Sequence, residues 1–320
     1  MKALQFNVTG TLAELELIER PRPKAGTDEV LVRVAAAGLN TSDVSNVLGK
    51  HPYTTLPRTP GRDFSGIVIE GPPEFAGRAV WGTGKEFGFT RNGSHAEFIT
   101  APTGGVALKP ESLSFSQAAA CGVPYTTAWS ALQRCGVGKE CRLLVIGAAG
   151  GVGSAALTLA RWLGAEVTAA VRKPGQASAL QAQGVPTVLM APGESLANSA
   201  KATLGSGFDV VFDTTGSCLA EAIAVLAPYG RVAIIVAHGD GMVNVPTRDL
   251  YRRAGSIVGI NSLLLSATDC AAILSRLQPA FDAGQLTPPS GMEERPLVRG
   301  VETYGELHRG ARCKFVLVAD

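Results

Sequence analysis

Between about residue 118 and residue 262, apolar runs and amphipathic segments alternate. The runs predict six strands, at 142–147, 166–171, 187–190, 208–213, 231–237 and 256–261. The segments between them predict helices near 152–163, 176–183 and 217–227. A continuous apolar run such as RLLVIG is typical of a strand covered on both faces. Strands alternating with helices indicate βαβ units, so we expect an α/β domain built on a doubly wound parallel sheet.

The flanking segments have a different texture. Residues 1 to about 117 alternate short apolar runs with Gly and Pro, which predicts a β-rich domain. After a predicted helix at about 268–283, the chain closes with the strand-like run CKFVLVA. We therefore expect the chain to return to the first domain, which would comprise 1–117 plus 263–320, with the α/β domain at 118–262 inserted.

Composition excludes several classes of protein. With 46% hydrophobic and 18% charged residues, the chain can build a sizeable core. A formal net charge of +2 does not indicate a nucleic acid or an anionic membrane as partner. The start lacks the apolar run of a signal peptide, and no stretch approaches a membrane span, so we expect a cytoplasmic protein. The six cysteines form no CxxC pair, which predicts reduced thiols.

A glycine-rich segment follows the first strand of the α/β domain. It reads Gly147-Ala-Ala-Gly150-Gly151-Val152-Gly153 and opens the predicted helix. Glycines here allow a tight turn, close approach to a pyrophosphate, and close packing of helix on strand. The helix N-terminus offers unpaired N–H groups to the phosphates. We predict a dinucleotide site contacted by Ala149, Gly150, Gly151 and Val152, the alternative being a glycine-rich turn without a nucleotide.

The end of the second strand bears on the choice of cofactor. NAD sites usually place an acidic residue there to bind the ribose 2′-hydroxyl. This chain has Arg172 and Lys173 instead, and its nearest acid, Glu166, lies at the other end of the strand. Two cations suit a 2′-phosphate, so we predict NADPH as the cofactor. The alternative is that both are solvated surface charges.

With these residues in view, the chain resembles the medium-chain dehydrogenase/reductase superfamily, in its zinc-independent quinone oxidoreductase branch. The resemblance implies a Rossmann domain inserted in a GroES-like β domain, a cofactor cleft, and a homodimer joined near 256–261. It rests on the order and spacing of the segments Gly38-Leu-Asn40-Thr-Ser-Asp43, Pro60-Gly61-Arg62-Asp63-Phe-Ser-Gly66, Gly93-Ser-His-Ala-Glu97-Phe, Pro124-Tyr-Thr-Thr127-Ala-Trp129, AAGGVG (148–153), Asp209-Val-Val-Phe-Asp213 and Gly230-Arg231-Val.

Two departures from the zinc-dependent relatives are informative. Where those relatives look like G-x-C-x-[ST]-D followed by G-H-E, Asn40 replaces the Cys ligand and Arg62 replaces the His ligand. Arginine stays protonated and cannot ligate zinc. We therefore expect no metal in the site.

Without a Lewis acid, the site suits acceptors that conjugation already activates. We predict an NADPH-dependent reductase that transfers hydride to a quinone or an α,β-unsaturated carbonyl, with hydrogen-bond donors stabilising charge on the carbonyl oxygen. The alternatives are an enoyl-thioester reductase, whose bulky carrier needs an open rim, and an NADPH-binding protein with little turnover.

Three residues are candidates for the chemistry. The resemblance implies that the Asn40 amide donates to a substrate or ribose oxygen, although an Asn can equally bind loop backbone. His51 lies where relatives often carry a Tyr, and Tyr53 follows two residues later. Either side chain could deliver a proton, and otherwise both are rim residues and water is the donor.

The remaining expectations come from place in the fold. Thr127 should lie on the cofactor face of the interdomain segment, and Thr214, Val236 and Ala237, at carboxyl strand ends, should line the nicotinamide side. Cys313 stands where relatives often show Gly, which puts a cofactor contact by Lys314 in question. We interpret the remaining polar groups of these motifs and the other histidines as structural or surface groups, namely Asp43, His95, Glu97, His238 and His308.

Overall fold

The computed structural model describes residues 1–200, 205, 207–237, 239–311 and 313–319, so His238 lies outside the described residues. The chain forms two compact units, unit 1 with residues Met1–Thr126 and Ser262–Asp320 and unit 2 with residues Thr127–Asn261. The first crossing between the units lies inside the long helix α2 (Phe115–Arg134). The predicted boundary after residue 117 falls at the beginning of this helix.

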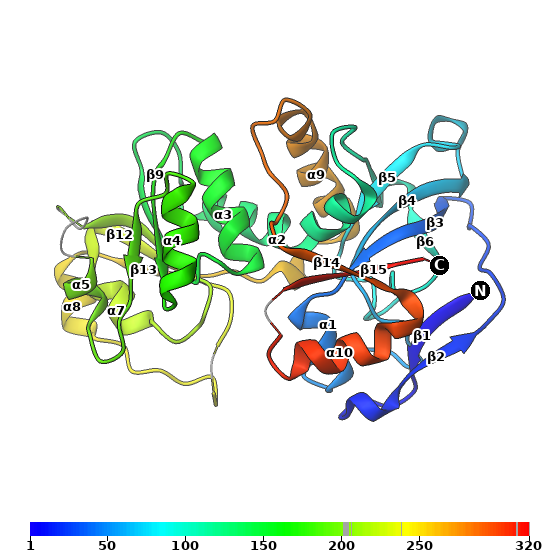
Figure 1. Ribbon diagram of the computed structural model, residues 1–320, viewed down its shortest axis with the longest axis horizontal. Coiled ribbons are helices and arrows are strands. Elements are labelled where there is room, and N and C mark those ends of the chain that lie inside the picture. The colour runs from blue at the N-terminus through cyan, green and yellow to red at the C-terminus, as the bar shows by residue number, and fades with distance from the viewer. Residues whose placement is uncertain (201–204, 206, 238, 312, 320) are drawn as a thin grey trace. The chain divides into compact units, whose positions relative to one another are not determined.

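Unit 2 is built on six parallel strands in the order β10-β9-β8-β11-β12-β13. Numbered along the chain this is 3-2-1-4-5-6, the order of a doubly wound dinucleotide-binding sheet. Helices α3 and α4 cover one face, and α5, α7 and α8 lie on the other (Figure 1). The elements are β8 (Arg142–Ile146), α3 (Gly151–Trp162), β9 (Glu166–Val171), α4 (Pro174–Ala182), β10 (Thr187–Leu189), α5 (Leu196–Ser199), β11 (Phe208–Asp213), α7 (Leu219–Ala224), β12 (Leu226–Ile234), α8 (Thr247–Arg252) and β13 (Ser256–Gly259).

The six predicted strands are present, which confirms the predicted fold class, but some predicted boundaries are wrong. β12 ends at Ile234 instead of residue 237, and β13 ends at Gly259 instead of residue 261. The helix expected over 217–227 ends at Ala224, and β12 begins at Leu226 instead of residue 231. Leu226 pairs with Phe208, and the register then shifts before Val210 pairs with Arg231. The strand contains Pro and Gly, which sequence patterns treat as a turn, and a bulge accommodates them.

Unit 1 is β-rich. Its main sheet has seven strands in the order β14-β15-β3-β4-β5-β7, with β6 paired to β3, and a separate hairpin joins β1 and β2. The elements are β1 (Lys2–Phe6), β2 (Leu15–Glu19), β3 (Glu29–Gly38), α1 (Thr41–Val47), β4 (Asp63–Glu70), β5 (Ala79–Gly82), β6 (Phe98–Pro102), β7 (Ala107–Leu108), α9 (Ala267–Asp282), β14 (Met292–Pro296), α10 (Gly300–His308), β15 (Lys314–Val318) and the short 3₁₀ helices at Leu12–Glu14, Pro73–Phe75, Thr103–Gly105, Ser262–Leu264 and Leu297–Arg299.

The registers of β3 bring distant segments of unit 1 together. β15 runs antiparallel to β3 with Val316 opposite Gly38, so the C-terminal strand extends the sheet begun by the first segment. On its other side, β3 places Gly38 opposite Asp63, the first residue of β4. The ends of three strands that are far apart in sequence therefore meet just before α1.

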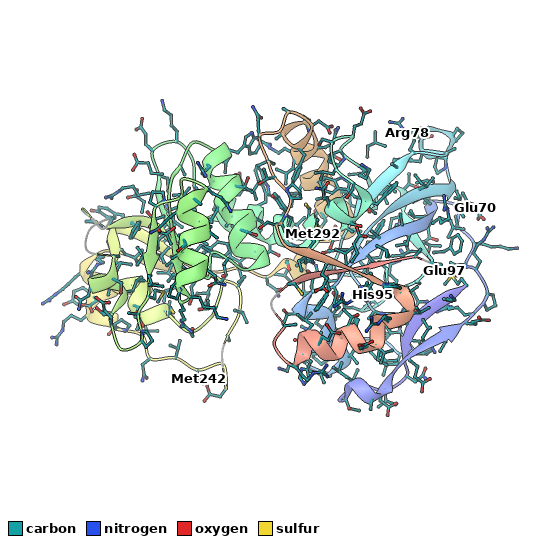
Figure 2. All side chains as sticks on the ribbon, in the orientation of Figure 1. Glu70, Arg78, His95, Glu97, Met242 and Met292 are labelled. Carbon is teal, nitrogen blue, oxygen red and sulfur yellow. The ribbon has the colours of Figure 1, made fainter. Side chains whose placement is uncertain are left out.

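Helix α10 and strand β3 enclose a buried histidine, His95, which Figure 2 labels in unit 1. Its Nδ1 is 2.7 Å from Tyr304 Oη, and its Nε2 is 3.3 Å from the carbonyl oxygen of Gly38. Burial lowers the pKa of His95 to about 3, and the charge of Lys314 lowers it further, while the bond to Gly38 opposes the shift. A neutral imidazole with both nitrogens bonded inside the unit is a packing element.

In the part of the chain that the structure describes, no helix combines the length and the apolar character needed to cross a membrane.

Candidate functional site

The glycine-rich segment lies where the strand order of unit 2 reverses, between β8 and β11. Ligands of such sheets bind at this switch point, outside the carboxyl ends of the strands. Gly150 is the N-cap of α3, and Ala149, Gly150 and Gly151 are exposed while Val152 is partly buried. The first N–H groups of a helix have no partner within it, so a twelve-residue helix presents them here to an anion.

Two glycines of the segment are required by geometry. Gly147 has φ +76°, a conformation that side chains rarely adopt, and a Cβ there would lie 2.5 Å from Thr214 Oγ1. A Cβ on Gly153 would lie 2.4 Å from the carbonyl oxygen of Gly147, which is fixed backbone. The helix can therefore approach the strand only because both positions lack side chains.

The two predicted cofactor cations lie after β9. Arg172 and Lys173 are both exposed, and Arg172 Nη2 donates to Ser217 Oγ over 3.1 Å. Ser217 belongs to the turn after β11, which the buried Asp213 carboxylate holds by accepting from the N–H groups of Thr215 (2.8 Å) and Cys218 (3.0 Å). A guanidinium and a hydroxyl thus lie together beside the switch point.

The other predicted cofactor residues are spread over three elements. Thr127 is buried in α2, and its Oγ1 has no hydrogen-bond partner among the described residues. The Thr214 hydroxyl donates to the carbonyl oxygen of Ile146 over 2.8 Å, so its proton is committed to β8. Val236 and Ala237, beyond the end of β12, are both exposed.

These residues fit a dinucleotide. A buried Thr127 hydroxyl that no described residue bonds, backbone that only glycine can supply, and exposed N–H groups at a helix start are what a pyrophosphate and its ribose require.

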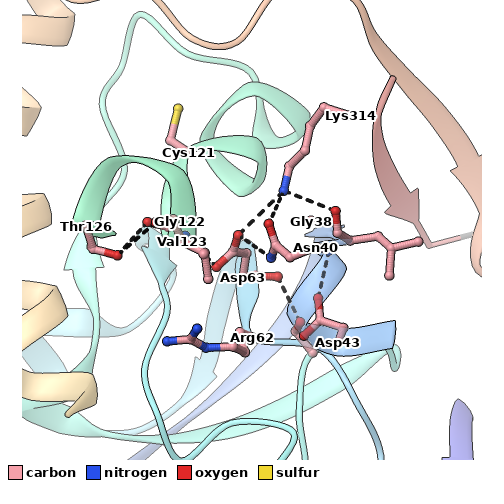
Figure 3. Close-up of polar contacts among 12 residues, drawn as sticks. Gly38, Asn40, Asp43, Arg62, Asp63, Cys121, Gly122, Val123, Thr126 and Lys314 are labelled. Carbon is pink, nitrogen blue, oxygen red and sulfur yellow. Dashed lines mark hydrogen bonds and ion pairs between the residues drawn. The ribbon is translucent and has the colours of Figure 1, made fainter. Parts of the chain in front are cut away.

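A second cluster of polar groups lies in unit 1, at the start of α1 (Figure 3). Asn40 Nδ2 donates to Asp63 Oδ2 over 2.9 Å, and Lys314 Nζ donates to Asn40 Oδ1 over 2.6 Å. Lys314 Nζ also donates to the carbonyl oxygen of Leu39 (3.3 Å) and lies 3.7 Å from Asp63 Oδ2. The second oxygen of Asp63 accepts from the N–H of Val123 over 2.8 Å. We call Asn40, Asp63 and Lys314 the amide network.

Burial shifts the charges around this network. Asp43, which accepts from the backbone N–H of Asn40 over 2.8 Å, is 1% exposed. Burial raises the pKa of Asp43 to about 7, and the charge of Asp63 adds to the rise. Burial lowers the pKa of Lys314, and the two carboxylates oppose that change.

Two further glycines make room for the network. A Cβ on Gly122 would lie 2.3 Å from Asp63 Oδ1, and a Cβ on Gly38 would lie 2.3 Å from the carbonyl oxygen of Ala119. The conformation of the network therefore depends on the absence of side chains at both positions.

Arg62 is buried beside the network, with 1% of its surface exposed. Its guanidinium donates to the carbonyl oxygen of Gly84 (3.1 Å) and to Ser262, at the carbonyl oxygen (3.2 Å) and the hydroxyl (3.4 Å). Figure 3 shows this side chain extending away from Lys314. The guanidinium therefore bonds to neutral oxygens of the chain and is not part of the amide network.

The two candidate proton donors lie together. Tyr53 Oη is 3.4 Å from His51 Nδ1, and both rings contact Phe89, with centroids 5.6 and 5.2 Å from it. His51 Nε2 is buried and has no partner among the residues that the structure describes. Burial lowers the pKa of His51, and the charges of Arg62 and Lys50 lower it further. Burial raises the pKa of Tyr53, which is 44% exposed, against the opposing charge of Arg62.

Within the described ranges, no group of three or more His, Cys, Asp or Glu side chains could hold a metal ion. The described cysteines are free thiols.

The structure brings together Asn40 with Lys314, and His51 with Tyr53. Sequence reasoning did not identify Asp63 and Lys314 as partners of Asn40, or Ser217 as a partner of Arg172. The sequence did contain one indication for Asp63, because it directly follows Arg62, which stands where zinc-dependent relatives have a His ligand. Lys314 is 274 residues from Asn40, and no local pattern connects them.

Comparisons with known proteins agree with this architecture. Residues 26–111 match the family described as alcohol dehydrogenase GroES-like domain, and residues 151–278 match zinc-binding dehydrogenase. The chain is 36% identical over 277 residues to "Zinc-type alcohol dehydrogenase-like protein C337.11" of Schizosaccharomyces pombe, covering 85% of this chain and 81% of that protein. It is 31% identical to "Quinone oxidoreductase" of Sus scrofa over 305 residues, 93% of this chain and 91% of that protein.

A solved structure described as an NAD-dependent alcohol dehydrogenase is 29% identical, with a TM-score of 0.89 over 100% of both chains. Both domains of the chain match family models, and the alignments with relatives above 30% identity cover most of this chain and most of each relative. The chain therefore belongs to the medium-chain dehydrogenase/reductase superfamily of nicotinamide-dependent oxidoreductases, in its quinone oxidoreductase branch.

Proposed function

We propose that this protein is an NADPH-dependent reductase of quinones or α,β-unsaturated carbonyl compounds that works without a catalytic metal. The observation that carries the proposal is the chemistry at positions 40 and 62. Where zinc-dependent relatives have metal ligands, this chain has an amide and a guanidinium. The Asn40 amide can donate a hydrogen bond, which suits an acceptor that needs its developing oxygen charge stabilised. The Arg62 guanidinium, which is bonded to Gly84 and Ser262, cannot ligate a metal.

A reduced nicotinamide, when bound, supplies the hydride. On the protein side, Asn40 donates to the carbonyl oxygen on which charge develops. Tyr53 and His51 deliver the proton, with the Tyr53 hydroxyl 3.4 Å from His51 Nδ1. The lowered pKa of His51 keeps its ring neutral near pH 7, so that one nitrogen donates and the other accepts. The similarity to a pig protein named quinone oxidoreductase supports this acceptor class.

The choice of NADPH rests on Arg172 and Lys173. Both are exposed at the end of β9, and Arg172 is held by Ser217. A 2′-phosphate gains a charge-assisted bond from each cation, whereas a 2′-hydroxyl gains much less. Because one structural relative is named as NAD-dependent, the affinities for NADPH and NADH are both measured.

The first experiment is a panel of acceptors with purified protein. Oxidation of NADPH and of NADH is followed with 1,2-naphthoquinone, an alkenal and crotonyl-CoA. We expect turnover with the quinone or the alkenal and a preference for NADPH. Turnover confined to crotonyl-CoA would instead indicate an enoyl-thioester reductase. Binding of NADPH without any turnover would indicate a cofactor-binding protein.

The cofactor assignment is tested by Arg172→Ala/Lys173→Ala. Loss of two charged bonds should weaken NADPH binding by about 2–4 kcal/mol while NADH binding is unchanged. Lys139→Ala is the matched control, because Lys139 lies in the same unit with 85% of its side chain exposed. Equal losses for both cofactors would contradict the assignment.

The homodimer is part of the same proposal. β13 is the last strand of its sheet, and an edge strand can pair with the same strand of a second copy. Light scattering of the wild type and of Val258→Pro should show a dimer and a monomer respectively. A wild type that elutes as a monomer would contradict this assembly.

A further inference from the structure

The donors and acceptors of the amide network can be counted one by one. An ammonium has three N–H groups and accepts none, and a carboxylate only accepts. Lys314 directs its N–H groups at Leu39, Asn40 and Asp63. Asp63 uses one oxygen for the N–H of Val123 and the other for Asn40.

This count fixes the orientation of the Asn40 amide. Lys314 can only donate, so the atom facing it must be the oxygen of Asn40. Asp63 can only accept, so the atom facing it must be the nitrogen. A flipped amide would place N–H against ammonium and oxygen against carboxylate, and both contacts would be repulsive. The two charged neighbours therefore hold the amide in one orientation.

One donor of the network is left over. The Asn40 nitrogen carries two hydrogens, and Asp63 accepts one of them. The other has no partner in the described ranges of the chain. Asn40 is partly exposed, whereas Asp63 is fully buried and the Lys314 side chain is 10% exposed. The spare hydrogen thus belongs to the most accessible member.

We propose that Lys314 and Asp63 are positioning residues that lock and polarise the Asn40 amide, so that its spare N–H is presented to the carbonyl oxygen of the acceptor. This inference rests on the proposed function, in which Asn40 contacts the acceptor. The ammonium on Oδ1 withdraws electron density from the amide and makes its N–H groups stronger donors. The position that holds a metal ligand in zinc-dependent relatives is here an amide backed by a cation.

The register of the sheet explains how the network forms. Val316 pairs with Gly38, so antiparallel pairing brings Lys314, two residues before Val316, to the level of Asn40, two residues after Gly38. Gly38 also pairs with Asp63. Cys313 in place of the usual Gly does not prevent this, because its side chain bonds to Glu293 over 3.3 Å.

The test separates positioning from structure with a double-mutant cycle. Lys314→Met, Asn40→Ala and the double variant are compared for kcat on 1,2-naphthoquinone and for NADPH affinity. We expect Lys314→Met to lower kcat by about tenfold or more, since a misplaced donor no longer stabilises the oxygen charge. NADPH affinity should be unchanged, and Lys314→Arg should restore part of the rate because it keeps the charge and the donors.

The cycle gives the decisive number. If Lys314 acts through Asn40, removing it in the Asn40→Ala background should change kcat by no more than about twofold. Lys109→Met is the matched control, because Lys109 donates hydrogen bonds to the backbone oxygens of Pro110 and Leu113 and lies over the Phe115 ring, away from the amide network. This variant should keep the wild-type kcat.

In Lys314→Met the buried Asp63 loses its cation, which lowers the stability of the fold, so a second variant is needed. Lys314→Met/Asp63→Asn removes both charges and leaves the Asn40 amide free to flip, so it should fold and still show the lower kcat. If Lys314→Met/Asp63→Asn folds and keeps the wild-type kcat, the inference is overturned. An undiminished effect of Lys314→Met in the Asn40→Ala background would also overturn it. Wild-type protein that reduces no acceptor would overturn the proposed function and this inference together, whereas the two preceding results overturn the inference alone.

Discussion

Replacement of Asp43 by Asn should change how the stability of the protein depends on pH. Asp43 is buried and accepts from the backbone N–H of Asn40 over 2.8 Å. An Asn side chain keeps an oxygen for this bond and removes the negative charge. The two proteins should then differ mainly in one titration.

The magnitude follows from the pKa of Asp43, which burial and the charge of Asp63 raise from 3.8 to about 7 in the folded protein. The folded state then binds the proton more tightly than the unfolded state. Stability from this group is fully present below pH 4 and is lost as the pH rises through 7. At about 1.4 kcal/mol for each pH unit between the two pKa values, the loss is about 4 kcal/mol. Relative to wild type, Asp43→Asn should gain that amount between pH 4 and pH 8.

Urea unfolding at several pH values gives the difference in free energy of unfolding between Asp43→Asn and wild type. Groups that titrate equally in both proteins cancel in this difference. Because the chain forms two compact units, one bulk signal does not isolate unit 1, so amide exchange of its strand β3 should be the probe. Asp269→Asn is the matched control, since Asp269 accepts from the N–H of Ser266 over 2.9 Å at the start of α9 but is exposed. Bonds from Ser266 lower the pKa of Asp269, so its contribution is lost as the pH falls. A pH-independent difference between Asp43→Asn and wild type would refute the reasoning.

Three further outcomes are expected. Gly153→Ala should weaken NADPH binding by about tenfold or more, because its Cβ would lie 2.4 Å from the carbonyl oxygen of Gly147. Fluorescence titration measures this, and an unchanged affinity would contradict it. Asp213→Ala should lower the free energy of unfolding by on the order of 3 kcal/mol, since the buried N–H of Cys218 and the partly buried N–H of Thr215 lose a charged acceptor. In urea, a loss below about 1 kcal/mol would argue against that role. His51→Ala and Tyr53→Phe should each slow reduction of an enone, and unchanged rates in both would make water the proton donor.

Local patterns predicted the fold well, for a physical reason. The inner strands β8, β9 and β11 of unit 2 are almost continuously buried, so each appears as an apolar run. The runs RLLVIG and FDVVFD lie within one residue of the observed strands. The boundary at β12 was wrong because Pro228 and Gly230 look like a turn. Pairing with β11 and burial of Leu226 outweigh that local preference.

One part of the candidate site could be predicted from local patterns and the other could not. The glycine-rich segment is local, since its strand, turn and helix are consecutive and the contacts that require Gly147 and Gly153 lie close to them in space. The amide network is not local. It depends on the register of three strands, and its cation comes from a segment 274 residues away from Asn40. Local sequence patterns do not reveal which residues pair across strands. Lys314 could therefore be noted in the sequence, but its partners could not be predicted.

The energetics of the amide network indicate why it is present. Two carboxylates and two cations lie around Asn40: Asp43, Asp63 and Arg62 are buried, and the Lys314 side chain is 10% exposed. Replacing buried ion pairs by apolar groups of similar volume is often neutral or stabilising. The raised pKa of Asp43 means that at neutral pH this carboxyl already reduces stability. Stability therefore does not account for the arrangement. What apolar residues could not supply is a fixed direction for the Asn40 amide, and a group that must meet a developing charge needs that direction before the charge appears.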